Sequence, residues 1–366
     1  MKNQLFSPYP LGNVELKNRI VMAPLTRSRA IDNLPNSLMA NYYGQRADAG
    51  LIITEGTSPS PNGLGYPRIP GCFTHEQAKG WKLTTDAVHE KGGRIFLQMM
   101  HTGRVSHPDN MPTGAEVLAP SAVPFENLKM YVDGKGELPI PLARPMEIDD
   151  ITKVVAEYAE TAKLAVEIGG FDGVEIHAAN GYLLEQFISP ITNKREDQYG
   201  GNIENRLRLV QNVMEAVVAG IGAERVGMRV SPYGVLNEMG AYDSVEETYL
   251  QLAELANKAG LVYLHTVDHA GMGAPAIPES IKQGLRDAFN GTLIISGNYD
   301  ATKAENDLVA DKGDLVAFGR PFISNPDLVE RFRQGARLQL PEAGTFYTPG
   351  PVGYIDYPFL VKETVS

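Results

Sequence analysis

The sequence has one cysteine among its 366 residues, so an internal disulfide is excluded. No Cys and His residues stand at zinc-finger spacing, and no metal site is predicted. Positive charge is scarce too: 33 Lys and Arg stand against 44 Asp and Glu, for a formal net charge of -11. This balance argues against nucleic-acid or anionic-membrane partners and favours a small-molecule partner.

Long apolar runs are also missing. No stretch of about 18 apolar residues occurs, and the N-terminal "MKNQLFSPYP" has no apolar core of signal-peptide length. We therefore expect a cytoplasmic protein outside the membrane, as a monomer or weak homo-oligomer. The chain is 43% hydrophobic and 21% charged, which is enough apolar material for a large globular core.

What the chain does contain is an alternation of apolar runs and amphipathic segments. The runs are typical of strands and lie at 19–25, 51–56, 94–101, 173–177, 225–231, 261–269, 292–298 and 315–320. Helical segments lie near 36–48, 74–91, 148–168, 203–220, 244–260, 278–290, 301–312 and 325–335, with caps expected around Asp150 and at Ser244. Eight such units favour a closed parallel barrel over an open sheet. The predicted fold is α/β, a (β/α)8 TIM barrel formed by residues 1–366 as one domain.

Three pieces remain outside the repeating units. "LFSPYPLGNVELKNR" (5–19) is typical of a hairpin, with Gly12-Asn13 as its turn, and we expect it to plug the floor of the barrel. Residues 102–146, rich in Pro and Gly, are too long for a plain loop after the third strand and predict an inserted lid or subdomain. The tail after Leu340 is expected to be irregular.

Polar residues follow the apolar runs, at the strand ends where such barrels carry their chemistry. These positions are Thr26, Gly56, Gln98, His101, His177, Arg229, His265 to His269, Gly297 and Arg320. "SGN" (296–298) and "FGRP" (318–321) stand where these barrels commonly bind phosphate. Backbone N–H groups near Gly297, Asn298 and Gly319, with the Arg320 guanidinium, could hold the anion. Two ordinary turns with a surface Arg remain the alternative.

Five motifs, in order along the chain, carry a resemblance to a known family. They are "MAPLTRSRA" (22–30), "LQMMHTGR" (97–104), "HAANGYLLEQFISPITNKREDQYGGNIENRLRL" (177–209), "MRVSP" (228–232) and "AFGRPFISNPDL" (317–328). Together they resemble the Old Yellow Enzyme family of flavin-dependent ene-reductases, closest to the bacterial N-ethylmaleimide and nitrate-ester reductases. The resemblance implies a barrel that binds FMN non-covalently and takes hydride from NADPH or NADH. It also implies reduction of the C=C bond of enones, enals or maleimides, with nitro compounds and nitrate esters as further substrates.

The resemblance implies a set of flavin contacts at the strand ends. A reduced flavin is anionic around N1 and the C2 carbonyl, so a fixed cation stabilises it there, and Arg229 is our candidate. Gln98 matches the family's Gln at the flavin pyrimidine edge, and a buried Gln bonded only to backbone is the alternative. Thr26 matches a Thr that hydrogen-bonds flavin O4. Pro24 and Gly56 are expected to contact the ring or ribityl chain through their backbone.

The same resemblance assigns the reacting groups. His177 and Asn180 match the two donors that hold the carbonyl or nitro oxygen of the substrate, on which charge develops as hydride arrives. Tyr182 matches the proton donor: hydride from flavin N5 would reach the β-carbon while Tyr182 protonates the α-carbon. A phenol with a pKa near 10 suits a general acid at neutral pH. Many members of the nitrate-ester branch have His where this chain has Asn180.

Further aromatic and apolar positions are expected in the pocket wall. Tyr66 and Tyr354 match aromatic positions that border the family's active site, and Met100 stands where some relatives carry Trp, which widens that side. No G-x-G-x-x-G follows a strand, so the nicotinamide is expected to stack over the flavin in the substrate's own pocket. The block "NKREDQYGG" (193–201) is expected to pin the loop before the next long helix.

Other classes of protein need residues that the sequence does not place well. A barrel glycosidase needs paired carboxylates at strand ends, and Glu55 and Glu175 each precede the end of a run. A Schiff-base aldolase needs a lysine inside the barrel, and none of the eight runs contains one. A non-enzymatic flavin carrier would share the FMN site, but it would need no proton donor such as Tyr182.

Overall fold

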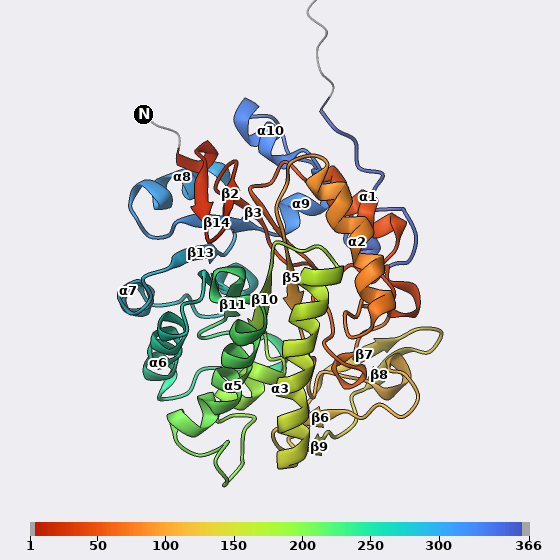
Figure 1. The fold of residues 1–366 in the computed structure, drawn as a ribbon, viewed down its shortest axis with the longest axis vertical. Helices are drawn as coiled ribbons and strands as arrows, with labels where there is room; N and C mark the ends of the chain where they lie inside the picture. Colours follow the sequence, from red (N-terminus) through yellow and green to blue (C-terminus); the bar gives the residue numbers. More distant parts are fainter. Residues whose placement is uncertain (1–3, 361–366) are drawn as a thin grey trace, which may run out of the picture.

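Eight buried apolar runs form one closed parallel barrel in the computed structural model, which describes residues 4–360 (Figure 1). The strands are β3 (Ile20–Met22), β4 (Leu51–Ile53), β5 (Ile95–Met99), β10 (Gly173–Ala178), β11 (Val226–Val230), β12 (Tyr263–Val267), β13 (Thr292–Ser296) and β14 (Leu315–Phe318). Each pairs with its neighbour in chain order, and β14 pairs with β3 to close the ring. The predicted (β/α)8 barrel is confirmed.

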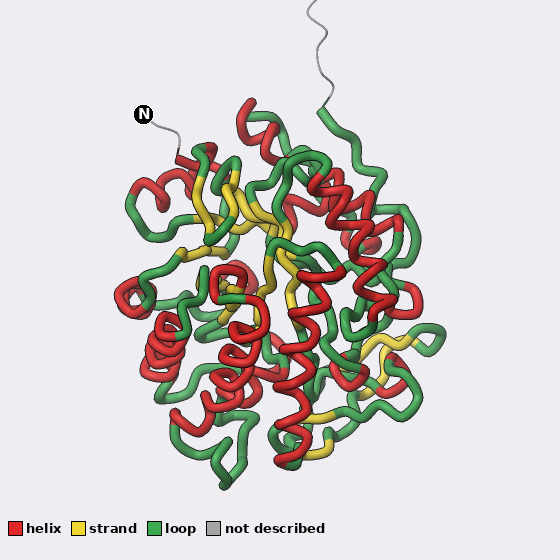
Figure 2. Tube along the Cα trace, in the orientation of Figure 1, coloured by secondary structure: helices red, strands yellow, loops and turns green. Residues whose placement is uncertain are grey.

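Helices surround the barrel and shield its strands from water (Figure 2). They are α1 (Ser37–Gln45), α2 (His75–His89), α3 (Ile148–Lys163), α4 (Leu183–Ile188), α5 (Ile203–Ile221), α6 (Val245–Lys258), α7 (Glu279–Ala288), α8 (Ala301–Val309), α9 (Arg320–Ser324) and α10 (Leu328–Gln334). The short helices α4 and α9 were not predicted, because five or six residues show no readable 3.6-residue period. No helix within residues 4–360 is long and apolar enough to cross a membrane.

The two expected caps behave differently. Asp150 belongs to a capping box at the start of α3, where it accepts the Glu147 backbone N–H at 2.8 Å. Ser244 stands at the N-cap of α6, but its side chain caps nothing and instead accepts a hydrogen bond from Arg206 at 3.3 Å. The position predicted for this cap is confirmed, but the Ser244 hydroxyl accepts from a neighbouring helix and bonds to no backbone N–H of α6.

The predicted N-terminal hairpin closes the floor of the barrel. Strands β1 (Tyr9–Leu11) and β2 (Val14–Leu16) pair antiparallel, and the fully buried Leu11 and Leu16 pack into the lower barrel core. Gly12 has φ +52, and a Cβ there would lie 2.2 Å from the carbonyl oxygen of Glu224, so the turn needs glycine. The hairpin thus fills this end of the barrel core, and the large cavity lies at the opposite end.

Residues 102–146 lie beside the barrel between β5 and α3 (Figure 1). They contain an antiparallel hairpin of β7 (Lys129–Val132) and β8 (Gly136–Pro139). A second pair, β6 (Leu118–Ala119) and β9 (Arg144–Pro145), brings the middle of the insertion next to its C-terminal end. The tail after Leu340 contains one short turn at 343–345 and otherwise no helix or strand up to residue 360, as expected.

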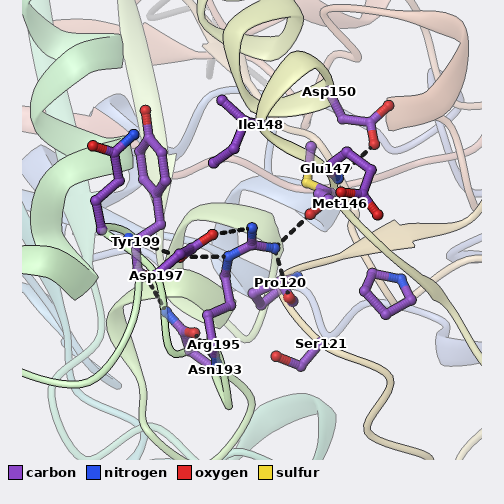
Figure 3. A network of polar contacts seen from close by, with 12 residues as sticks. Pro120, Ser121, Met146, Glu147, Ile148, Asp150, Asn193, Arg195, Asp197 and Tyr199 are labelled. Atoms are coloured by element: carbon purple, nitrogen blue, oxygen red, sulfur yellow. Dashed lines mark hydrogen bonds and ion pairs between the residues drawn. The ribbon is translucent and has the colours of Figure 1, made fainter.

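One guanidinium, that of the largely covered Arg195, ties the base of this insertion to the loop before α5 (Figure 3). Arg195 donates to the carbonyl oxygens of Pro120 at 3.1 Å and Met146 at 2.5 Å. Its other nitrogens form an ion pair with Asp197. Asn193 donates to the carbonyl oxygens at Phe187 and Tyr199 on either side of the loop. The 193–201 block pins this loop, as expected, and also anchors the insertion.

Candidate active site

A cavity of about 1120 Å³ opens at the C-terminal ends of the strands, opposite the hairpin. Its walls come from the strand ends, from the β7–β8 hairpin and from the tail after α10. Of the residues that the sequence predicted for the site, it brings together Pro24, Thr26, Gly56, Tyr66, Gln98, Met100, His177, Asn180, Tyr182, Arg229 and Arg320. The strand-end rule supplied Thr26, Gly56, Gln98, His177, Arg229 and Arg320 among these, and the family resemblance supplied the others.

A hydrogen-bonded chain of buried side chains lies inside the barrel beneath the cavity. Gln98 donates through Nε2 to Glu175 Oε1 at 2.8 Å, and Glu175 Oε2 lies 2.8 Å from His265 Nδ1. Because Nε2 is turned to Glu175, the amide oxygen of Gln98 is left as the acceptor for a ligand. Glu175 and His265 are fully buried, which removes that carboxylate from the glycosidase role considered above.

Arg229 sits beside this chain, in register with His177 on β10 and His265 on β12. Its side chain is 7% exposed, and its Nε has no hydrogen-bond partner among residues 4–360. Burial lowers the pKa of Arg229, but a guanidinium stays charged at neutral pH. A buried cation with an unsatisfied donor calls for an acceptor, and the electron-rich N1 and C2 carbonyl region of a flavin meets that need.

Only one of the residues expected to bind phosphate lines the cavity. Arg320 is exposed at the start of α9 and lines the cavity. Gly297, Asn298 and Gly319 lie outside the lining, although they stand directly after β13 and β14. The Gly297 carbonyl accepts from Lys303, which places a second cation close to this end of the barrel.

His177, Asn180 and Tyr182 converge on the cavity from the end of β10 and the turn that follows it. The rings of His177 and Tyr182 meet edge to face with centroids 5.1 Å apart. Tyr182 donates its hydroxyl to that of Tyr66 at 3.2 Å. Asn180 and Gly181 have φ of 60° and 75°, which turns the chain sharply and brings Asn180 and Tyr182 to the same cavity. Asn237 donates to the Asn180 carbonyl at 2.7 Å and holds the turn from outside.

Burial and neighbouring charge fix the protonation states of this turn. Burial lowers the pKa of His177 well below its usual range, and Arg229 lowers it further. His177 is therefore a neutral imidazole, which donates through one nitrogen. Burial raises the pKa of Tyr182, and that of Tyr66 well above 10, so both phenols keep their protons at neutral pH.

The structure corrects the prediction for Tyr354. Its ring is fully buried and stacks on Tyr42 with centroids 4.0 Å apart, outside the cavity lining. The tail lines the cavity earlier, through a segment that includes Phe346 and Tyr347. An irregular segment has no periodicity that could show which of its aromatic residues faces inward.

Two buried arginines fasten this part of the tail. Arg29 donates to the carbonyl oxygens of Phe346 at 2.7 Å, Thr345 at 2.9 Å and Val352 at 3.0 Å. Arg27 donates to the Gly353 carbonyl at 2.7 Å and also to that of Phe346 at 3.1 Å. The motif "MAPLTRSRA" had pointed to Pro24 and Thr26 as flavin contacts. Its two arginines have a further role, because they bind carbonyls more than 300 residues away in sequence and hold the tail segment that forms one wall of the cavity.

Sequence reasoning also missed residues at the cavity mouth. They include Ile31, Arg68, Lys129, Tyr131, Glu137 and Met272, which come from loops and from the β7–β8 hairpin. Arg68 forms an ion pair with Asp133 in the hairpin turn and donates to the Tyr347 carbonyl at 2.8 Å. It joins the insertion to the tail across the mouth, a contact that no local sequence pattern announces.

Comparisons with known proteins agree with this geometry. A family model described as NADH:flavin oxidoreductase / NADH oxidase matches residues 4–339. The chain is 42% identical to a 12-oxophytodienoate reductase of Oryza sativa, over 97% of this chain and 93% of the rice protein. It is 40% identical to a flavin oxidoreductase of Emericella nidulans, over 97% of each.

Solved structures give the same picture. Morphinone reductase superposes with a TM-score of 0.95 at 46% identity, covering 98% of this chain and 97% of that one. The same enzyme in complex with tetrahydroNAD superposes with a TM-score of 0.93. An old yellow enzyme homologue from Zymomonas mobilis superposes with a TM-score of 0.92 at 39% identity, covering 98% of this chain and all of that one.

Proposed function

We propose that this chain, which belongs to the NADH:flavin oxidoreductase / NADH oxidase family, reduces activated alkenes. It is an FMN-dependent NAD(P)H oxidoreductase of the Old Yellow Enzyme kind. The substrates proposed are enones, enals and maleimides, with nitro compounds and nitrate esters as further candidates. The resemblance found in the sequence is thereby confirmed for the family, while its bacterial branch stays a prediction.

The observation that carries the proposal is the meeting of neutral His177, Asn180 and protonated Tyr182 in one cavity with the unsatisfied cation Arg229. FMN, when bound and reduced by NAD(P)H, supplies the hydride. We assign its ring to Pro24, Thr26, Gly56, Gln98 and Arg229. We assign its phosphate to Arg320 with the backbone at Gly297, Asn298 and Gly319.

His177 and Asn180 are assigned to the substrate oxygen. His177 Nδ1 and Asn180 Oδ1 are buried without a hydrogen-bond partner within the described residues, and both side chains line the cavity. We infer that both side chains are available to a ligand, the imidazole and the amide each through an N–H group. Negative charge builds up on the oxygen of an enone as its β-carbon receives hydride, and two fixed donors stabilise that charge more than the neutral carbonyl. Without them the carbon–carbon double bond is a poor acceptor.

Tyr182 is assigned as the proton donor to the α-carbon. Its raised pKa keeps the hydroxyl proton in place until the carbanion-like carbon appears. The neighbouring Tyr66 hydroxyl can then turn and donate to the oxygen that has lost its proton. The β7–β8 hairpin and the rest of 102–146 are proposed as a lid that keeps water from this step.

Separate measurement of the two half-reactions tests the proposal. Tyr182→Phe should leave the anaerobic bleaching of the flavin band by NADH nearly unchanged. It should slow reoxidation by 2-cyclohexenone about 100-fold or more, the usual contribution of general acid catalysis. Equal slowing of both half-reactions would reject Tyr182 as the donor, and a wild-type flavin that the enone never reoxidises would reject the alkene assignment.

Tyr354→Phe is the matched control. It removes one phenolic hydroxyl from a fully buried residue outside the cavity, where that hydroxyl has no partner among residues 4–360. Both half-reactions should proceed at wild-type rates. A specific loss in the enone step for Tyr354→Phe would return this residue to the pocket wall.

A further inference from the structure

The turn that carries Asn180 and Tyr182 is held from behind by a buried carboxylate, Glu185. This side chain lies on α4 and is 3% exposed. Its Oε2 accepts the Gly181 backbone N–H at 2.5 Å, and its Oε1 accepts the Ser231 hydroxyl at 2.8 Å. Ser231 Oγ in turn accepts the Asn180 backbone N–H at 2.8 Å. One carboxylate therefore fixes two consecutive peptide groups, one directly and one through a hydroxyl.

This turn needs an external hold because its backbone is unfavourable on its own. Asn180 has φ 60°, in the left-handed region that costs energy for residues with a Cβ. Gly181 has φ 75°, and a Cβ there would lie within 3.0 Å of Met239, Asn237 and Leu236. A small rotation of this dipeptide would redirect both Asn180 and Tyr182, the two groups assigned to the substrate.

We propose that Glu185 is a positioning residue, which holds the Asn180–Gly181 turn in the conformation that presents Asn180 and Tyr182 to the substrate. It acts through Gly181 and Ser231 and touches neither substrate nor flavin. The inference rests on the proposed function of this turn. It adds a residue to the site that lies outside the cavity lining and that no strand-end position could indicate.

The surroundings of Glu185 make its hold sensitive to pH. Burial raises the pKa of Glu185 to about 7. Tyr249 on α6 donates to its Oε1 at 2.6 Å, and Tyr242 lies nearby, but burial raises the pKa of both phenols above 10. From α5, the Nε of Arg206 donates to the Ile188 carbonyl instead. Within residues 4–360 Glu185 has no ion-pair partner, so it alone among these groups changes charge near neutral pH.

The test uses the FMN-loaded protein and the variants Glu185→Gln and Ser231→Ala. Phenol is titrated into the oxidised protein, and the flavin absorbance reports its binding beside the Asn180 turn. Hydrogen exchange of a peptide covering 178–186 reports the turn itself. Both variants should bind phenol about tenfold more weakly and exchange faster, since each removes a hydrogen bond that holds the turn. Wild-type affinity together with wild-type exchange would overturn the inference.

Tyr249→Phe is the control matched to this site. It removes a hydrogen bond to the same carboxylate but none to the turn. Because that bond lowers the pKa of Glu185, the comparison is made at about pH 9, where the carboxylate stays ionised, and phenol affinity should stay within about twofold of wild type. A loss as large as in Glu185→Gln would mean that the effect is general packing, and the inference would fail. Exchange protection in the wild type, corrected for the intrinsic rate, should also decline as pH falls below 7, and Glu185→Gln should abolish that dependence.

These measurements separate the inference from the function on which it rests. Phenol binding and hydrogen exchange require no turnover. If the wild type fails to reduce 2-cyclohexenone while the variants behave as expected, the alkene assignment falls and the role of Glu185 in holding the turn stands. If the wild type reduces the enone and the variants match it in every measurement, the inference falls and the assignment stands.

Discussion

Asn180 suits its position both in its backbone conformation and in its side chain. Its φ of 60° belongs to the region that Asn tolerates better than most side chains, because its short amide can hydrogen-bond locally. The same side chain lines the cavity, where its amide is proposed to donate to the substrate. A β-branched or bulky residue here would strain the turn as well as remove the donor.

Arg229 supports a prediction about FMN binding. Arg229→Gln should weaken FMN binding about tenfold to a hundredfold, because a hydrogen bond from a charged group to its acceptor is lost. The flavin midpoint potential should become more negative, since the cation favours the reduced, anionic form. Equilibrium fluorescence of released FMN and a spectroelectrochemical titration measure the two effects.

Two comparisons sharpen that experiment. Arg229→Lys keeps the charge and should recover most of the potential. Arg320→Gln should weaken FMN binding without moving the potential, because its proposed contact is the phosphate, away from the ring. An unchanged affinity and potential in Arg229→Gln would contradict the assignment of this cation to the flavin.

Site residues at strand ends were predictable because, in a (β/α)8 barrel, the C-terminal ends of the strands all face the same end of the molecule, where the site lies. Gln98, His177 and Arg229 each lie on or just after an apolar run, and all three line the cavity. Tyr354 was misplaced because the tail has no period from which its direction could be read. Glu185 was missed because its partners Ser231 and Tyr249 lie 46 and 64 positions away and appear only once the chain is folded.

Among the elements, strands and long helices were predictable and the insertion was not. Seven of the eight barrel strands fall inside their expected runs, and β10 extends one residue beyond its run to Ala178, since a strand buried on both faces is largely apolar. The insertion instead consists of two-residue and four-residue strands, held by contacts such as those of Arg195. Every residue carries a backbone carbonyl, so the sequence does not show which carbonyls Arg195 binds. The shape of the insertion could therefore not be predicted.

Arg195 leads to a prediction about this element. Arg195→Ala removes the donors to Pro120 and Met146, so hydrogen exchange should speed up at 118–121 and 144–147 while the barrel strands stay protected. A stability loss of about 1–3 kcal/mol is expected from the unsatisfied carbonyls. Exchange mass spectrometry and urea unfolding measure the two effects.

Arg208→Ala serves as the comparison for Arg195. Its guanidinium donates to the Gln198 carbonyl at 2.8 Å from a more exposed place on α5 and makes no contact with the insertion. Exchange at 118–121 should then match the wild type. Acceleration there in Arg208→Ala, or none in Arg195→Ala, would mean that the anchor lies elsewhere.

At the scale of the whole molecule, buried carboxylates make stability depend on pH. Glu55 is fully buried, accepts the Arg27 N–H and the Tyr43 hydroxyl, and has its pKa raised by burial from 4.5 to about 7. A carboxyl whose pKa is higher folded than unfolded favours folding at low pH, and that stability is lost as pH rises through 7. The protein should therefore lose this contribution as pH rises from about 4.5 to about 7, with little further change above that.

Glu55→Gln tests this dependence. Between pH 5 and 9 the free energy of unfolding of the wild type should fall relative to the variant by up to about 3 kcal/mol. Urea unfolding at each pH, with excess FMN throughout, measures the difference. The exposed Glu160→Gln on α3 should instead run parallel to the wild type. A difference between Glu55→Gln and the wild type that does not vary with pH would contradict the buried-carboxyl account.

The fastening of the tail by Arg27 and Arg29 has a consequence for how the protein is made. A chain emerges from the ribosome with its N-terminal part first, so both arginines emerge more than 300 residues before the carbonyls that they bind. Until the tail is synthesised, both arginines lack these carbonyl acceptors and the cavity lacks one wall. The cavity can therefore be completed only after the segment around Phe346 has been synthesised.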